Sequence, residues 1–366
     1  MNNSSGAIDP PASTRPRIVF LVMSAVSRPA TVDQLAHALA PHLVLVHHDF
    51  SQTQDFPLHA PNVRFVPNPR RTGWAVFGFV DGIFHSLRHA MANLDFDYLQ
   101  LLSPTCLPIK PLAQFEAHVS AGAQAHFDCI DLLRDRDALM SVGYRAFTPE
   151  RSFRHRVLRR LSQGYFGPDS GRRDEAGIWL RSGAGKGAMP WIALAAVKAL
   201  CPPWIGQHIF DNSFRPYYGS AWFGARRHVV GGMVEVFSRP GVRDYFSGLR
   251  ISDEFLIPTL LMHLGPPKGP MNHFIQRYNQ AHPGVIEEAD IAQLARSGAY
   301  FARKFADDPA EQARVRVLRE LARVDPLLPL DSGLVSAPRA RPVSEDPCRG
   351  NAGVGGPRWP VQPRTQ

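Results

Sequence analysis

The chain has 366 residues, a hydrophobic content of 44% and a formal net charge of +9. This length and composition suit a globular protein with a sizeable core, and they argue against a membrane-spanning helix, because no run reaches the ~20 apolar residues that a bilayer requires. The positive charge indicates an acidic partner, which could be nucleic acid, an anionic membrane or a phosphorylated small molecule.

The four cysteines, Cys106, Cys129, Cys201 and Cys348, lie far apart and form no C-x-x-C pair. We therefore expect free thiols in a reducing compartment, not a zinc site or a disulfide framework. The apolar run at residues 18–26 is too short for a span and lacks the basic start of a signal peptide. The expected location is the cytoplasm.

Composition also predicts where the ordered part begins and ends. Residues 1–15 are small, polar and Pro-containing, and residues 327–366 are rich in Pro, Gly, Arg and Ser. We expect a disordered leader and a disordered tail there. Residues 16–326 are expected to form a single domain.

The first half of this domain alternates apolar, β-branched runs with helical patterns. Strands are expected at residues 18–23, 43–49, 63–66, 98–103 and 127–132, and helices at residues 31–39, 79–94 and 112–119. Continuous apolar runs are typical of strands buried on both faces. The alternation predicts an α/β fold with a doubly wound, mostly parallel central sheet flanked by helices.

Asp49 follows the second of these strands. Ligands bind at the carboxyl ends of the strands in such sheets, so Asp49 is a candidate nucleotide contact. An aspartate after a strand is equally often a turn residue, and the pattern alone does not choose between the two roles.

Residues 145–181 are crowded with arginines, namely Arg151, Arg154, Arg156, Arg159, Arg160, Arg172 and Arg173. Apolar residues at near-helical spacing predict an amphipathic helix with a solvated basic face. Contact with an anionic membrane or an acidic acceptor is the alternative. We expect no nucleic-acid partner, because no helix-turn-helix, zinc-finger or RNP-like pattern accompanies the charge.

The remaining elements are expected in the second half of the chain. Residues 183–187 (GAGKG) lack the Walker spacing and are expected to form a loop. Helices are expected at residues 227–236, 287–296 and 309–324, and a turn at residues 282–283.

Residues 250–261 place an acidic pair, Asp253 and Glu254, at the start of an apolar helix. Ser252 or Asp253 is the expected N-cap, and residues 255, 256, 259 and 260 are the expected buried face. A carboxylate fixed at a helix end suits a general base, which must stay within hydrogen-bond reach of its proton. The simpler interpretation is that both carboxylates only complement the helix dipole.

Transfer of a sugar from a nucleoside diphosphate needs such a base, and it also needs a positive group for the departing diphosphate. A metal held by an Asp-x-Asp triplet is one solution. Residues 95–97 precede their strand and are poorly placed, and residues 135–137 carry a central arginine that would repel a cation. The basic alternative is Lys304, together with Arg277.

Six stretches of the sequence, taken in order, support this chemistry together. They are residues 46–49 (VHHD), 71–74 (RTGW), 96–109 (FDYLQLLSPTCLPI), 219–223 (GSAWF), 252–255 (SDEF) and 301–305 (FARKF). In this order they resemble the core-2/I-branching β-1,6-N-acetylglucosaminyltransferases of glycosyltransferase family 14, which also includes peptide O-xylosyltransferases. The resemblance spans nearly the whole of residues 16–326.

The resemblance implies a GT-A-like glycosyltransferase fold, a UDP-sugar donor, inversion at the anomeric carbon and no metal or other cofactor. It implies that Glu254 is the catalytic base and Lys304 a diphosphate ligand. Asp49 would contact the uridine, and Arg277 is the nearest candidate for a second diphosphate ligand. The residues expected to line the pocket or contact the acceptor are Trp74, Ser220, Trp222 and Asp253.

Two departures from the family pattern matter. Residues 104–106 (PTC) replace a Gly-x-Asp element, so any donor contact of that aspartate is missing or supplied elsewhere. The anchor and the many cysteines of secreted-pathway members are absent, which suggests a bacterial-type member in the cytoplasm, with peripheral contact to the inner face of the membrane through residues 145–181.

The expected activity is transfer of N-acetylglucosamine from a UDP-sugar to a hydroxyl of a saccharide or glycoconjugate acceptor. The alternatives are a xylosyltransferase that uses UDP-xylose and a catalytically silent protein that binds glycan or membrane.

Overall fold

The computed structural model of the chain describes residues 15–167, 171–173, 179–200, 208–265, 273–275, 278–279 and 282–326. Contacts divide the chain into two units, Met1–Pro326 and Leu327–Gln366. Every described residue belongs to the first unit. Residues 1–14 of the expected leader and the whole expected tail therefore lie outside the described residues.

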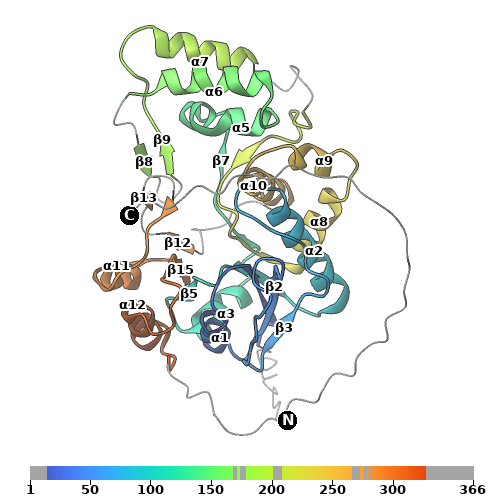
Figure 1. Ribbon diagram of the computed structural model, residues 1–366, viewed down its shortest axis with the longest axis vertical. Helices are drawn as coiled ribbons and strands as arrows, with labels where there is room; N and C mark the ends of the chain where they lie inside the picture. The colour runs from blue at the N-terminus through green and yellow to red at the C-terminus, as the bar shows by residue number, and fades with distance from the viewer. Residues whose placement is uncertain are drawn as a thin grey trace, which may run out of the picture. The chain divides into compact units, whose positions relative to one another are not determined.

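A six-stranded, mostly parallel sheet forms the centre of this unit (Figure 1). Its strands, in the order β3-β2-β1-β4-β11-β6, are Val63–Phe65, Leu43–His48, Ile18–Ser24, Tyr98–Leu102, Gly224–Arg226 and Ala125–His126. One strand, β11, runs antiparallel to the other five, because it pairs antiparallel with both β4 and β6. The strand order reverses at β1, because β2 and β3 lie on one side of it and β4 on the other, and such a reversal is where doubly wound sheets bind ligands.

Helices cover both faces of the sheet. Successive side chains of β1 point to opposite faces, so Val19, Leu21 and Met23 join one buried cluster while Ile18, Phe20 and Val22 join another. The first cluster includes α2 (Gly78–Asn93), α8 (Arg227–Phe237) and α10 (Asp253–Leu264), and the second includes α1 (Pro29–Ala38) and α3 (Leu112–Ser120). The expected mixed α/β architecture with a mostly parallel, helix-flanked sheet is confirmed.

Short strands form further small sheets. The three-stranded one, in the order β12-β15-β5, consists of His273–Ile275, Phe301–Arg303 and Leu107–Pro108. The three pairs are β7 (Ile130–Asp131) with β10 (Tyr217–Tyr218), β8 (Gly171–Arg173) with β9 (Trp179–Arg181), and β13 (Tyr278–Asn279) with β14 (His282–Pro283).

The remaining helical segments are short, apart from two. The short ones are α4 (Arg136–Ala138), the π-helical η1 (Leu139–Gly143), α5 (Tyr144–Phe147), α9 (Val242–Ser247), the 3₁₀ turn η2 (Glu288–Asp290), α11 (Ile291–Arg296), α12 (Gln312–Arg316) and the π-helical η3 (Val317–Ala322). The expected helix at residues 309–324 is therefore shorter and changes to π geometry after Arg316.

Two expected elements are wrong. The strand at residues 127–132 is instead two strands in different sheets, because β6 pairs with β11 whereas β7 pairs with β10. The chain between them passes so close to Gly219 that a Cβ there would lie 1.9 Å from the Asp128 carbonyl oxygen. Residues 282–283 are a strand and not a turn, since they pair with β13.

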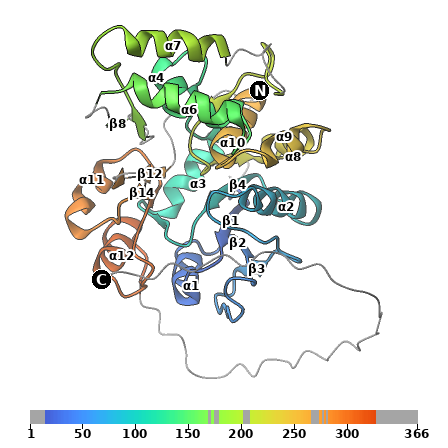
Figure 2. The same cartoon turned by 45° about the horizontal axis from the view of Figure 1, so that its top comes forward.

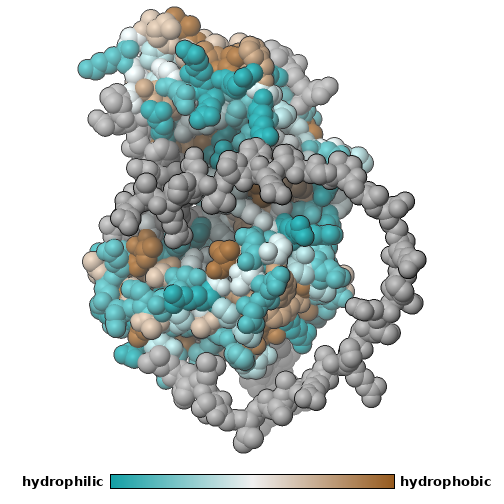
Figure 3. Space-filling model, in the orientation of Figure 1, coloured by the Kyte–Doolittle hydropathy of each residue, from teal (hydrophilic) through white to brown (hydrophobic). Residues whose placement is uncertain are grey.

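Two longer helices, α6 (Phe153–Tyr165) within the Arg-rich segment and α7 (Met189–Leu200) after it, lie side by side in Figures 1 and 2. The expected helix in the Arg-rich segment is thus confirmed. The α7 helix exposes Met189, Trp191 and Ile192, and apolar side chains gather over it at the top of Figure 3. No helix among the described residues has both the length and the apolar composition of a membrane span.

Candidate active site

Glu254 lies in the first turn of α10, whose environment differs from the expected one. The helix is buried on all sides from Phe255 to Leu261, not along one face. Ser252 occupies the N-cap position, but it has helical dihedral angles and its buried hydroxyl makes no capping hydrogen bond. Packing around the whole helix, instead of a side-chain cap, therefore fixes the position of Glu254.

Glu254 is paired with Arg145 of α5. Arg145 Nη2 donates to Glu254 Oε2 over 2.5 Å, and the guanidinium lies 5.2 Å from the Phe255 ring centre and 5.8 Å from the Tyr218 ring centre. Burial works to lower the pKa of Arg145, but the Glu254 carboxylate outweighs it and the pKa is raised. Among the described residues Glu254 Oε1 has no hydrogen-bond partner, so this oxygen is left to accept a proton.

Asp253, the other member of the acidic pair, has unusual electrostatics. Burial, and next the neighbouring Glu254 carboxylate, raise the pKa of Asp253 to about 7. A carboxyl group that titrates near neutral pH is suited to proton transfer. The acidic pair therefore combines one carboxylate held by an arginine with a neighbour whose pKa is raised by burial and by that carboxylate.

The segment 219–223 connects the acidic pair with the closing motif. The Gly219 amide donates to the Glu254 carbonyl oxygen over 2.9 Å, and the Trp222 amide donates to Ser220 Oγ over 3.2 Å. The Trp222 ring then lies beside Arg303, whose guanidinium is 4.6 Å from the ring centre. Arg303 directly precedes Lys304 in the chain. One run of contacts therefore links four of the expected site residues, Glu254, Ser220, Trp222 and Lys304.

This run of contacts lies at the carboxyl edge of the parallel strands. The antiparallel register aligns Gly224 with Gln100 of β4, so residues 221–223 lie beside the carboxyl end of β4. Asp49, at the end of β2, reaches the same edge, where its amide donates to the Ser24 carbonyl oxygen at the end of β1. This is the edge at which open α/β sheets bind ligands.

Lys304 is exposed, and no acidic side chain of the described residues forms an ion pair with it. Its carbonyl oxygen accepts a hydrogen bond from Ile286, and the next amide, that of Phe305, donates to the Thr105 carbonyl oxygen over 2.9 Å. The backbone is thus fixed on both sides while the ammonium group stays available. Arg277, the expected second ligand, lies outside the described residues.

Asp49 is buried and organises the loop around it. Its two carboxylate oxygens accept hydrogen bonds from the amide and hydroxyl of Ser51, from Gln52 and from the amide and hydroxyl of Thr72. Burial acts to raise the pKa of Asp49, but these hydrogen bonds lower it well below its usual range. Asp49 therefore holds residues 51–52 and 72 together, which agrees with the turn role that the sequence offered beside a nucleotide contact.

The loop at residues 104–106 places Cys106 beside His273. Some enzymes use a Cys–His pair of this kind for nucleophilic catalysis. Cys106 Sγ lies 3.4 Å from His273 Nε2 and 3.1 Å from Ser103 Oγ. Burial raises the pKa of Cys106 and lowers the pKa of His273 to about 3. A nucleophilic cysteine needs the opposite, a lowered pKa, so this pair is structural.

Trp74 lies beside the residues that precede α10. Its side chain is 70% exposed, and the Arg250 guanidinium lies 5.4 Å from its ring centre. The neighbouring residues Ala75 and Ile251 have positive φ angles of 63° and 52°, and the Ile251 amide donates to the Ala75 carbonyl oxygen. Such a backbone costs about 1–3 kcal/mol per residue and is found mostly at functional sites.

The Asp-x-Asp carboxylates have other partners. Asp95 and Asp97 pair with Arg17, and Asp135 caps α4 through the Ala138 amide. Asp137 accepts from Tyr165 and from the Gly183 amide. Within the described ranges no group of three or more His, Cys, Asp and Glu side chains is arranged to hold a metal ion.

Neither a scan against protein-family models nor a search of the curated proteins finds a match to this chain. Sequence reasoning missed Arg145 and Arg303. Arg145 is 109 positions from Glu254, and no local pattern distinguishes it from the other arginines of its segment.

The raised pKa of Asp253 predicts a pH-dependent stability. An acid whose pKa is higher in the folded state contributes stability below its unfolded pKa of about 4, and this stability is lost as the pH rises toward 7. We expect Asp253→Asn to gain stability relative to the original chain between pH 4 and 8, by more than about 1 kcal/mol. Urea denaturation at each pH measures it, and a constant difference across this range would contradict the assignment.

Proposed function

We propose that the chain is an inverting glycosyltransferase with a GT-A-like fold that transfers a sugar, N-acetylglucosamine in the first instance, from a UDP-sugar to a saccharide hydroxyl. The main support is the run of contacts from Glu254 through Gly219 and Trp222 to Arg303 and Lys304. It joins motif residues from three distant parts of the sequence at the edge where such sheets bind ligands.

In the proposed reaction Glu254 Oε1 takes the proton of the acceptor hydroxyl. The hydroxyl oxygen attacks the anomeric carbon from the face opposite the diphosphate, the bond from this carbon to the diphosphate oxygen breaks, and UDP leaves with both bonding electrons. Arg145 holds Oε2, so the base has a fixed orientation, which is what general-base catalysis requires.

The departing diphosphate gains negative charge, which Lys304 would stabilise together with Arg303. Lys304 is exposed and has no acidic partner among the described residues, and Arg303 is held against Trp222. Preorganised cations of this kind stabilise a leaving group without a metal. Asp49 contributes by shaping the loop after β2, and a direct uridine contact would require it to exchange one of its present partners.

Removing the base tests the central assignment. Glu254→Gln should lower sugar transfer at least about a hundredfold, the usual contribution of a general base, while UDP binding is unchanged because the base acts on the acceptor. Transfer of labelled sugar from UDP-N-acetylglucosamine and from UDP-xylose to a saccharide panel measures it. Glu235→Gln, an exposed change on α8, is the matched control. Full activity of Glu254→Gln would show that the base lies elsewhere.

The phosphate assignment has a separate test. Lys304→Ala should weaken UDP binding about tenfold, the loss expected for one charge-assisted hydrogen bond, when calorimetry is run in EDTA. Lys198→Ala, an exposed lysine on α7, removes the same charge and should have no effect. Binding that requires manganese would point to Asp135 and Asp137 instead, and absence of UDP binding would oppose the transferase proposal as a whole.

A second candidate function is peripheral binding to an anionic membrane without catalysis. It is supported by α7, where Met189 and Ile192 are 71% and 58% exposed, and by the arginines of the neighbouring helix α6. Interfacial helices combine such apolar side chains with basic neighbours.

This candidate predicts binding to phosphatidylserine vesicles in a sedimentation assay. Ile192→Ser should weaken it about tenfold, as expected when one large aliphatic side chain no longer enters the interface. Val285→Ser, at another exposed aliphatic position, should not. Binding to neutral phosphatidylcholine vesicles that is as strong as binding to phosphatidylserine vesicles would contradict the role of charge.

A further inference from the structure

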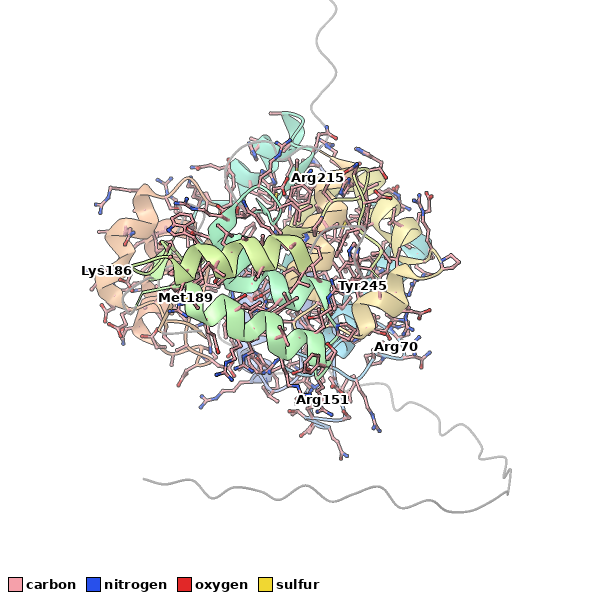
Figure 4. All side chains as sticks on the ribbon, turned by 90° about the horizontal axis from the view of Figure 1, so that it is seen from above. Arg70, Arg151, Lys186, Met189, Arg215 and Tyr245 are labelled. Carbon is pink, nitrogen blue, oxygen red and sulfur yellow. The ribbon has the colours of Figure 1, made fainter. Side chains whose placement is uncertain are left out.

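A cavity of about 310 Å³ lies beside the acidic pair, between the start of α6 and the residues that precede α10. This volume falls within the range of roughly 300–1,000 Å³ that is typical of small-ligand pockets. Five arginines line it, namely Arg145, Arg151, Arg156, Arg159 and Arg250. Figure 4 labels Arg151 at one end of the α6–α7 pair, with Lys186 and Met189 at the other.

The acidic side chain that lines this arginine pocket is not enough to neutralise the positive charge of its arginines. Glu150 is the acidic side chain of the lining, and it pairs with Arg250 over 3.3 Å. In the part of the chain that the structure describes, Arg151, Arg156 and Arg159 have no carboxylate within ion-pair distance. Guanidinium groups crowded in this way repel one another and match the planar oxygen pairs of carboxylates and phosphates.

Arg145 connects the pocket to the candidate base. It lines the cavity while its Nη2 donates to Glu254 Oε2. Its Nε is buried and has no acceptor among the described residues. Nε lies on the same edge as Nη2, and a buried donor without a partner is costly. On the opposite edge Nη1 donates to no acceptor among the described residues, so the guanidinium retains hydrogen-bonding capacity on the side that does not face Glu254.

The rim of the pocket offers a surface for a sugar ring. Arg250 lines the pocket and also lies over Trp74, whose ring is 70% exposed. An exposed indole next to a polar pocket provides an apolar face against which the C–H groups of a sugar can pack. This combination of ring and cations suits an acidic sugar better than a free anion.

We propose that the arginine pocket binds the acidic group, a carboxylate or a phosphate, of the saccharide acceptor. This assignment rests on the proposed transferase function and deepens it. The acidic group occupies the arginine pocket, the ring of the same sugar lies on Trp74, and the acceptor hydroxyl faces Glu254 Oε1. The donor diphosphate is bound separately, at Lys304, which does not line the pocket.

Calorimetry of the full chain tests this with glucose 6-phosphate and glucuronate as probes and glucose as the neutral reference, at constant ionic strength. Arg159→Gln should weaken binding of both acidic sugars about tenfold or more, as expected for a lost charge-assisted hydrogen bond. Arg160→Gln is the matched control, because Arg160 is the next residue of α6, is exposed and does not line the pocket. UDP binding should be the same in both variants.

Four results would overturn the proposal. Equal losses of affinity in the Arg159 and Arg160 variants would indicate a general charge effect. Equal binding of glucose and glucose 6-phosphate would show that the acidic group is not recognised. Competition by UDP would show that the pocket is the donor site. Displacement of glucose 6-phosphate by phosphatidylserine vesicles, dependent on Arg159, would assign the pocket to a lipid headgroup instead.

The UDP titrations separate this proposal from the transferase proposal. Arg159-dependent binding of acidic sugars together with UDP binding supports both. Arg159-dependent binding without any UDP binding supports an anion site but overturns its role for an acceptor, because the transferase proposal then fails. UDP binding without preference for acidic sugars overturns only the pocket assignment.

Discussion

The ion pair between Arg145 and Glu254 is the interaction on which the rest of the site depends. It joins α5 to the first turn of α10 over 2.5 Å and is enclosed by the rings of Tyr218 and Phe255. The pair is half-buried, since 16% of the Arg145 side chain and 31% of the Glu254 side chain are exposed, and removing one partner leaves the other charge uncompensated. The pair therefore fixes the orientation of Glu254, the proposed base, and links α5 to the first turn of α10.

The central sheet explains why distant motifs meet. In a parallel sheet the carboxyl ends of the strands share one edge, and the single antiparallel strand β11 brings the residues before it, 219–223, to that same edge. Gly219 allows this approach, since any side chain there would collide with the Asp128 carbonyl group. Backbone contacts thus bring residues 219–223 to the edge, and side-chain contacts then join them to the other parts of the candidate site.

The parts of the structure that sequence could predict are those encoded by short-range periodicity. Continuous apolar runs located β1, β2 and β4, and helical spacing located α1, α2 and α8, each to within a few residues. The division of residues 125–131 between two sheets depends on pairing with β10 and β11, almost 100 positions later. Arg145 was missed for the same reason, because its role comes from packing against α10 and not from its neighbours in the chain.

The geometry of Arg145 has a consequence for which hydroxyl of an acceptor would react. Its planar guanidinium is already committed to Glu254 through Nη2, so an anion in the arginine pocket must use the other donors of the same rigid group. The proposed base and the acceptor's acidic group are then held at two edges of one planar group, at a separation that the guanidinium sets. A lysine would neutralise both charges but could not fix this separation. In the proposed enzyme, Arg145 thus acts as a positioning residue that selects the hydroxyl presented to Glu254.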